Sequence, residues 1–184
     1  GVENVSIVEG GTIVTNGIRV TTDTALKVKL TTGYGYVKPV ITNISDANIV
    51  ASEVDAENNI WEITGFTTEF SFTAEAEPTD FAVRINTLSL DTNDVLTTDE
   101  NSAMLLQNGS SLVGSKAKYL SVVNYVASVQ TAGYVFYGWF TGVESAEGKI
   151  TNYGTLVSEE LAYDHTVLAD ISLTAIFKFT EVTI

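Results

Sequence analysis

Residues 91–101 form a short stretch that is rich in the side chains that bind calcium. The candidate ligands there are Asp91, Asn93, Asp94 and Asp99. Calcium takes oxygen ligands from carboxylates, amides and backbone carbonyls, all of which this stretch offers. The EF-hand spacing is absent, because Val95 stands at the fifth ligand position and Leu96 stands where that loop needs glycine. The stretch therefore predicts either a structural calcium site without a known motif or a solvated acidic loop.

Aromatic residues offer a second kind of site, because ring faces stack on sugars. The candidates for such a ligand site are Trp61, Tyr137 and Tyr34, with Tyr36 and Tyr153 as further rings. Trp61 alternates with Glu62 and Ile63, a pattern that favours a core-facing position for the indole. Sugar binding and core packing both stay open for this residue.

The residues that most enzymes use as nucleophiles and bases are scarce. The chain has one histidine, His165, and no cysteine, which excludes thiolate zinc sites, disulfides and cysteine nucleophiles. The sequence contains neither a Gly-x-Ser-x-Gly motif nor a phosphate-binding glycine loop. Carboxylates are plentiful, but no spacing selects a pair for glycoside hydrolysis. We therefore expect that the protein is not an enzyme and carries no cofactor, structural calcium apart.

The charge balance narrows the classes of partner. Nine lysines and arginines stand against 23 aspartates and glutamates, which gives a formal net charge of −14. Binding to a nucleic-acid backbone needs clustered positive charge, so we expect no nucleic-acid partner. The sequence holds no run of about 18 apolar residues, so we expect no membrane insertion of this segment.

The elements that must position these residues are predicted to be strands, in a mainly β protein with little helix. Apolar and polar residues alternate over 26–30, 61–63, 70–77, 81–85 and 171–179. A period of two is typical of half-buried strands, and the 25 threonines and many valines favour strands as well. Two stretches are ambiguous. Residues 115–129 fit a helix or a strand, and Ser158 is placed to cap a short helical turn.

Two similar halves follow one another along the chain. Gly33-Tyr34 and Gly133-Tyr134 each follow a strand-like run, and a Thr-Ala pair comes later in each half. Ala74 stands 40 residues after Tyr34, and Ala175 stands 41 residues after Tyr134. Matching landmarks at nearly equal spacing indicate an internal repeat.

The repeat predicts two small β-rich modules in tandem. The first module covers residues 1–78, and the second covers residues 79–184. Residues 79–101 are an extra segment at the start of the second module, and they include the acidic stretch.

The second module carries a longer and more specific pattern. Residues 132–140 read Ala-Gly-Tyr-Val-Phe-Tyr-Gly-Trp-Phe, and residues 170–177 read Asp-Ile-Ser-Leu-Thr-Ala-Ile-Phe. This pattern resembles the internalin-B-type repeat of bacterial cell-surface proteins, also called the Listeria–Bacteroides repeat, best over residues 132–177. The residues that carry the resemblance are Gly133, Tyr134, Phe136, Gly138, Trp139, Leu173, Ala175 and Phe177. The first module is divergent, because it keeps Gly33-Tyr34 but has no Gly-Trp pair.

The resemblance implies β-grasp-like modules in tandem on a secreted or surface-anchored protein, with no catalytic residues. It implies an extracellular location at the surface of a bacterium, with an unknown protein or glycan there as the partner. We expect a non-catalytic segment that acts as a spacer, a stalk or an adhesive repeat module. An isopeptide staple, as in some Gram-positive surface domains, would need Lys27, Lys29 or Lys178 buried beside an acid.

Two alternative functions stay open. One is a binding module for a glycan or protein ligand, which would present an aromatic patch to solvent. The other is a structural component of a pilus or phage fibre, in which the strand-like run at 181–184 pairs with a neighbour. The physical reading of the Gly-Trp motif favours the core, because Trp139 and Phe136 bury large apolar surfaces there.

Overall fold

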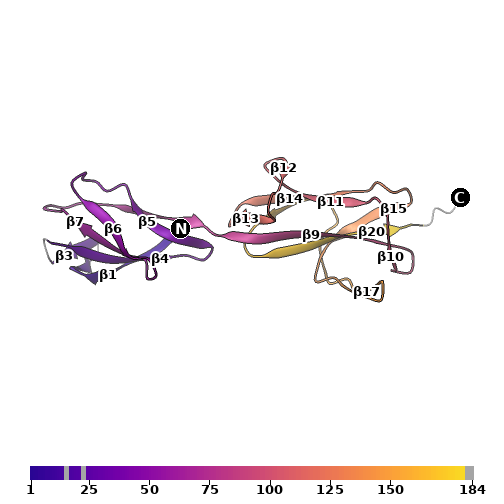
Figure 1. Cartoon of the computed structure of the whole chain (residues 1–184), viewed down its shortest axis with the longest axis horizontal. Helices are drawn as coiled ribbons and strands as arrows, with labels where there is room; N and C mark the ends of the chain where they lie inside the picture. Colours follow the sequence, from indigo (N-terminus) through magenta and orange to yellow (C-terminus); the bar gives the residue numbers. More distant parts are fainter. Residues whose placement is uncertain (15–16, 22–23, 181–184) are drawn as a thin grey trace. The chain divides into compact units, whose positions relative to one another are not determined.

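The structure is a computed structural model, and it describes residues 1–14, 17–21 and 24–180 (Figure 1). Every regular element in those ranges is a β-strand, which confirms the predicted mainly β class. The contacts divide the chain into two units, Gly1–Thr79 and Asp80–Ile184. The division lies one residue beyond the boundary expected from the sequence. The strand expected at 181–184 lies outside the described residues.

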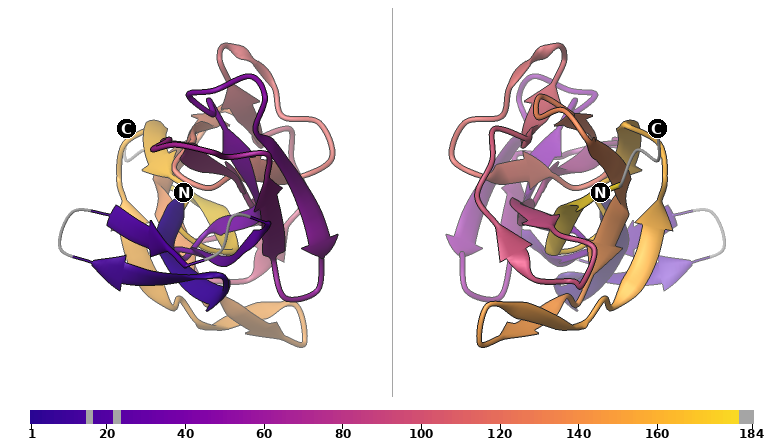
Figure 2. Two further views of the ribbon diagram at one scale, coloured as in Figure 1. Left: turned by 90° about the vertical axis from the view of Figure 1, so that its left-hand side faces the viewer. Right: turned by 90° about the vertical axis from the view of Figure 1, so that its right-hand side faces the viewer.

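Unit 1 is built from one larger sheet and two strand pairs. Its strands are β1 (Val2–Glu9), β2 (Gly11–Val14), β3 (Gly17–Val20), β4 (Leu26–Thr32), β5 (Tyr36–Thr42), β6 (Val50–Asp55), β7 (Ile60–Thr64) and β8 (Thr73–Pro78). The larger sheet is antiparallel in the order β1-β4-β7-β6, and β2–β3 and β5–β8 are antiparallel pairs. The end-on view of unit 1 in Figure 2 (left) shows these strands wrapped around its interior.

The core of unit 1 lies on one face of β4. Leu26, Val28 and Leu30 are buried on that face, as their alternation predicted. Lys27 points to the opposite face, where its Nζ lies 2.9 Å from a carboxylate oxygen of Glu9. The period of two along β4 therefore separates an apolar interior from a charged surface.

Unit 2 has two main sheets. Its strands are β9 (Asp80–Leu90), β10 (Leu96–Thr97), β11 (Ser102–Gln107), β12 (Ser110–Ser111), β13 (Lys116–Lys118), β14 (Val122–Ser128), β15 (Tyr134–Thr141), β16 (Glu144–Ala146), β17 (Lys149–Asn152), β18 (Thr155–Ser158), β19 (Ala162–Thr166) and β20 (Ile171–Phe179). One sheet has the order β10-β9-β20-β15-β18, with β13 also on β9, and the other has the order β12-β11-β14-β19. Strands β16 and β17 form a separate hairpin. Figure 2 (right) shows unit 2 from its end.

The core of unit 2 is centred on aromatic residues. Trp139 is fully buried, and its ring lies 5.4 Å from the rings of both Tyr125 and Phe136. The indole Nε1 donates a hydrogen bond of 2.9 Å to the carbonyl oxygen of Glu160. Burying about 200 Å² of aromatic surface contributes about 5 kcal/mol at roughly 25 cal/mol per Å². The Gly-Trp motif is thus a core anchor, as its residue types predicted.

The two units share a pattern of strand pairing. In unit 1 the central strand β4 pairs on either side with β1 and β7, and in unit 2 the central strand β14 pairs with β11 and β19. Each unit also has a second antiparallel pair, formed by β5 with β8 and by β15 with β20. The order of these five strands along the chain is the same in both units.

The register of the second pair matches as well. Val37 lies opposite Glu77 and Val40 opposite Glu75, so three steps along β5 face two steps along β8. Val135 lies opposite Lys178 and Gly138 opposite Ile176, which is the same irregularity between β15 and β20. A β-bulge of this kind bends the strand and changes where its side chains point.

The structure corrects one correspondence inferred from the sequence. Gly35-Tyr36, rather than Gly33-Tyr34, occupies the position of Gly133-Tyr134. The carbonyl oxygen of Gly35 accepts a hydrogen bond of 2.8 Å from Thr79, and that of Gly133 accepts one of 2.7 Å from Thr180. Both glycines have positive φ, 79° and 85°, a conformation that favours glycine.

Three further expectations meet the structure differently. The strand predicted at 70–77 begins only at Thr73, because Phe70 and Phe72 belong to a loop held by the hydrogen bond from Ser45 to the carbonyl of Ser71. Ser158 caps no helix. Its hydroxyl accepts a hydrogen bond of 3.1 Å from the Glu160 amide in a tight turn. The ambiguous stretch at 115–129 contains the strand β14, as its valines favour.

Candidate functional site

The most elaborate polar contact in unit 2 surrounds the ammonium group of Lys178. Its Nζ lies 4.3 Å from the ring centre of Tyr137 and 4.6 Å from that of Tyr153. The same atom lies 3.1 Å from Oδ1 of Asp94. We call these four residues the Lys178 cluster. It unites a tyrosine predicted to bind ligand with an aspartate predicted to bind calcium.

A β-bulge places Tyr137 in the cluster. Phe136 lies opposite Phe177 and Gly138 opposite Ile176, so Tyr137 is the extra residue between two paired positions. Its ring therefore leaves the alternation of β15 and stacks on Phe140 at 5.7 Å. Gly138 makes the bulge possible, because its φ is 147° and a Cβ there would lie 2.7 Å from a Leu156 methyl group.

A tight loop between β9 and β10 places Asp94. Oδ1 of Asp91 accepts hydrogen bonds from the amides of Asn93 and Val95, at 2.8 and 2.9 Å. The loop is tied to β17, because the amide of Ile150 donates to the carbonyl oxygen of Asp94 at 3.1 Å. Asp94 has a φ of 61°, a conformation that aspartate tolerates better than most residues.

The charges of the Lys178 cluster stabilise one another. The hydroxyl of Tyr153 donates a hydrogen bond to Oδ1 of Asp94, and this bond, together with Lys178, lowers the pKa of that carboxyl group. Burial lowers the pKa of Lys178, but its contacts with Tyr153 and Asp94 raise it by more, so the net pKa is raised. Burial and the bond to Asp94 raise the pKa of Tyr153. The cluster therefore holds a protonated lysine and an ionised aspartate over a wide range of pH.

This arrangement binds a cation, and the cation is the chain's own lysine. The aromatic faces and the carboxylate supply the two features that recognise ammonium groups. The side chain of Lys178 is 25% exposed, so it is not enclosed as an isopeptide donor would be. Tyr137 keeps 44% of its surface exposed.

The other predicted calcium ligands are used within the chain. Asp91 is engaged by loop amides, and Oδ1 of Asp99 accepts a hydrogen bond of 2.8 Å from the amide of Asn101. Across residues 1–14, 17–21 and 24–180, no three acidic, histidine or cysteine side chains are grouped to hold a metal ion. The structure brings Asp94 to Lys178 rather than to Asp91, Asn93 and Asp99.

The two predicted aromatic ligand residues of unit 1 have different surroundings. Tyr34 lies in the turn between β4 and β5 and is 69% exposed. Trp61 lies on β7 and packs against the core, as its alternation favoured. Its indole Nε1 is buried without a hydrogen-bond partner. Tyr137 belongs to unit 2, so the three predicted ligand residues do not lie in one unit.

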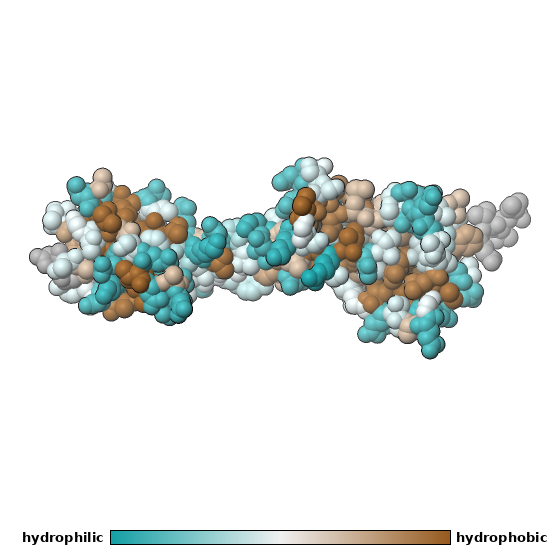
Figure 3. All heavy atoms as spheres, viewed as in Figure 1, coloured by the Kyte–Doolittle hydropathy of each residue, from teal (hydrophilic) through white to brown (hydrophobic). Residues whose placement is uncertain are grey.

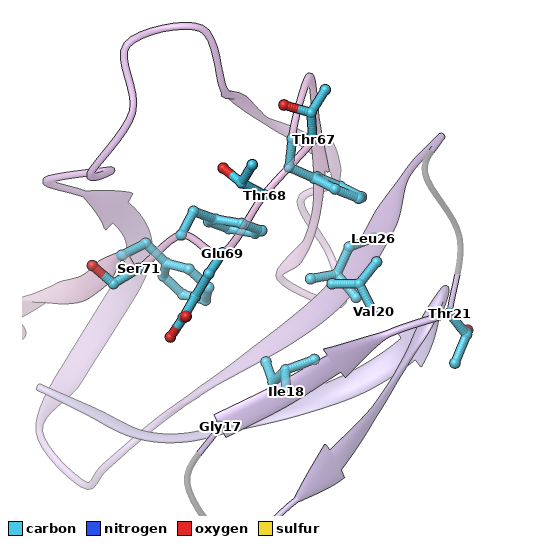
Figure 4. Close-up of a pocket in the computed structure, with 12 residues that line it drawn as sticks. Gly17, Ile18, Val20, Thr21, Leu26, Thr67, Thr68, Glu69 and Ser71 are labelled. Atoms are coloured by element: carbon cyan, nitrogen blue, oxygen red, sulfur yellow. The ribbon is translucent and has the colours of Figure 1, made fainter.

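A groove in unit 1 was not predicted from the sequence (Figure 4). It lies between β3 and the loop that leads to β8, has a volume of about 900 Å³, and we call it the Phe70 groove. Its lining includes Ile18, Val20, Leu26, Phe66, Glu69 and Phe70. The rings of Phe66 and Phe70 stack at 5.5 Å. In Figure 4 the loop carries Glu69 above the apolar side chains of Ile18 and Val20.

The signal for this groove was present but read as something else. Phe70 and Phe72 alternate with polar residues, and the sequence therefore predicted a strand there. An additional phenylalanine, Phe66, directly after Gly65 was the sign of a loop that folds its rings together.

The visible surface of each unit mixes apolar and hydrophilic residues (Figure 3). In unit 2, apolar surface gathers near β10 and β17, beside a hydrophilic hairpin tip. Within the described ranges, no helix has the length and apolar character needed to cross a membrane. No protein-family model, curated protein or solved structure matches the chain.

Proposed function

We propose that this chain is a non-catalytic spacer segment of a bacterial surface protein, made of two β modules of the internalin-B repeat type. The observation that carries the proposal is the shared register of β5–β8 and β15–β20, including the bulge at the same place. A repeated fold with the same irregularity supports tandem copies of one module rather than two unrelated domains.

The connection between the units supports a spacer. β8 ends at Pro78 and β9 begins at Asp80, so Thr79 alone separates the last strand of unit 1 from the first strand of unit 2. Flexible linkers between domains are usually longer and rich in glycine or serine. A one-residue connection between two strands restricts the freedom of the modules.

The placement of the large aromatic residues also supports this proposal. The motif residues Trp139 and Phe177 are fully buried and hold unit 2 together rather than facing solvent. The net charge of −14 favours solubility and discourages self-association of neighbouring copies. An adhesive role would add a ligand site to the same scaffold.

The spacer role is tested by measuring how widely the distance between the units varies. The chain has no cysteine, so a spin label can be placed at Ser52→Cys in unit 1 and Thr155→Cys in unit 2 without background labelling. Both positions are exposed on strands. We expect a distance distribution nearly as narrow as that of a pair within unit 2, Ser110→Cys with Thr155→Cys.

A reference for flexibility is the same labelled chain with Gly-Ser-Gly-Ser inserted after Pro78. The insertion is expected to broaden the distribution severalfold. If the unmodified chain is already as broad as the inserted one, the units are loosely tethered and the spacer proposal is wrong.

A second candidate function is ligand binding, which the Phe70 groove favours. Its volume and its stacked rings are typical of sites for small or extended apolar ligands. A screen against glycans and peptides tests it, with Phe70→Ala as the groove variant and Tyr34→Ala as an exposed aromatic control. Binding that is lost in the first variant and kept in the second supports a site in the groove.

A further inference from the structure

The strand β8 is paired along only one of its two edges. Its partner is β5, and no other described strand pairs with it. The amide of Thr79 donates to Gly35, so by alternation the amides of Ala74 and Ala76 point away from β5. An isolated two-stranded pair is only marginally stable, and an unpaired edge accepts further strands.

The equivalent edge in unit 2 is occupied. There β20 corresponds to β8, and β9 pairs with it in parallel from Ile171 to Lys178. Glu75 and Glu77 of β8 correspond by register to Ile176 and Lys178 of β20. Leu88 and Leu90 of β9 lie opposite those two residues of unit 2. Unit 2 therefore shows what kind of element completes this sheet and in which direction it runs.

The chain end of unit 1 lies where this strand would pair. A Cβ on Gly1 would lie 3.2 Å from the amide nitrogen of Ala76, so Gly1 sits against the edge of β8 (Figure 1). In unit 2, Asn101 precedes β11 and its side chain reaches Ser89 on β9, at 3.5 Å, rather than β20 itself. An incoming strand would thus move Gly1 away from Ala76.

The side chains of β8 state the chemistry of its partner. Ala74 packs against the core, so the strand needs apolar residues on that face. Glu75 and Glu77 are exposed on the opposite face, and only Lys38 approaches this pair among the printed ion pairs of the described residues, at 3.6 Å from Glu77. Positions beside the two glutamates therefore favour lysine or arginine, because opposite charges on neighbouring strands attract.

We propose that the free edge of β8 is an acceptor site for a strand of another polypeptide. The strand runs parallel to β8, and its apolar residues alternate with lysine or arginine. Main-chain hydrogen bonds to Ala74 and Ala76 supply the affinity, and the pairing of basic residues with Glu75 and Glu77 supplies the selectivity.

The experiment uses the full chain and a peptide probe that copies the element found in unit 2. The probe is the segment Val83–Leu90 with Leu88→Lys and Leu90→Lys, which places two cations beside Glu75 and Glu77. Titration followed by NMR is expected to shift the amide resonances of 73–77 and of Val2. Hydrogen exchange of the Ala74 and Ala76 amides is expected to slow at least tenfold.

The matched control is the same peptide with Leu88→Glu and Leu90→Glu, which should bind at least tenfold more weakly. The chain variant Glu75→Lys/Glu77→Lys should reverse this preference and bind the glutamate peptide better. Both substitutions are at exposed positions, so the fold of unit 1 is expected to survive.

Ala76→Pro tests the main-chain contact separately. Proline removes the amide that points to the free edge, and edge strands tolerate it there. We expect loss of peptide binding while the resonances of β5 stay in place. The proposal is overturned by shifts that map to the Phe70 groove, by no shift at 73–77 at millimolar peptide, or by equal binding of all four charge combinations.

Discussion

Lys178 and Tyr137 meet because a β-bulge turns the tyrosine ring toward a lysine on the neighbouring strand, at 4.3 Å from Nζ to the ring centre. The contact joins the motif strand β15 to the last strand of the unit. Each unit has one tryptophan, Trp61 or Trp139, so the fluorescence of a Trp61→Phe variant reports the unfolding of unit 2 alone.

Lys178→Met is expected to destabilise unit 2 by about 1 kcal/mol. The substitution keeps the apolar stem but removes the cation from the two tyrosine rings and from Asp94. Urea unfolding followed by Trp139 fluorescence measures the change. Lys116→Met on the exposed strand β13 is the matched control, and an equal loss in both variants would contradict a special role for the cluster.

Gly138→Ala is expected to cost unit 2 about 2–3 kcal/mol. The φ of 147° is unfavourable for alanine, and its methyl group would lie 2.7 Å from Leu156 and 3.1 Å from the carbonyl oxygen of Ser158. Gly148→Ala is the control, because Gly148 also has positive φ but open space around it. The crowding is disproved if the two variants lose the same free energy of unfolding.

Tyr125→Phe is expected to leave unit 2 equally stable or to stabilise it by about 1 kcal/mol. The hydroxyl of Tyr125 is buried without a hydrogen-bond partner, and burial raises the pKa of this phenol. Removing an unsatisfied polar group removes its desolvation cost, while the ring keeps its contact with Trp139. A loss of more than 1 kcal/mol in urea unfolding would show that the hydroxyl has a partner in solution.

Unit 2 is expected to lose stability as the pH falls below about 6.5, because of His165. Burial lowers the pKa of its imidazole in the folded state, so the unfolded chain takes up a proton first. Above that pH both states are neutral and the histidine contributes no pH dependence. His165→Gln should flatten the stability profile between pH 7 and pH 5, as measured by urea midpoints. A profile as steep as that of the parent chain would assign the effect to other groups.

The local pattern of the sequence predicted many of the strands. Alternation located β4, β7 and β20, because one face of each strand is buried and the other is wet. It also predicted that Trp139 lies in the core. Alternation failed at Phe70 and Phe72, where the apolar residues belong to a loop that packs its rings on the sheet.

The pairing of distant residues could not be predicted in the same way. The sequence reads Gly-Tyr-Gly-Tyr over 33–36, so two registers of the repeat fit the pattern equally well. Only the hydrogen bond from Thr79 to Gly35 decides between them. The Lys178 cluster was hidden for a similar reason, because its residues come from four elements and a bulge decides where Tyr137 points.

The parallel pairing of β9 with β20 has a mechanical consequence. These are the first and last strands of unit 2, and they are paired over eight positions from Val83 to Leu90. A pull on the chain from both ends of the unit would slide the two strands past each other in shear. All of their hydrogen bonds would then share the load, instead of breaking one after another as in unzipping. Unit 1 has no such pairing between β1 and β8 in its described part, so under tension it should give way at a lower force than unit 2.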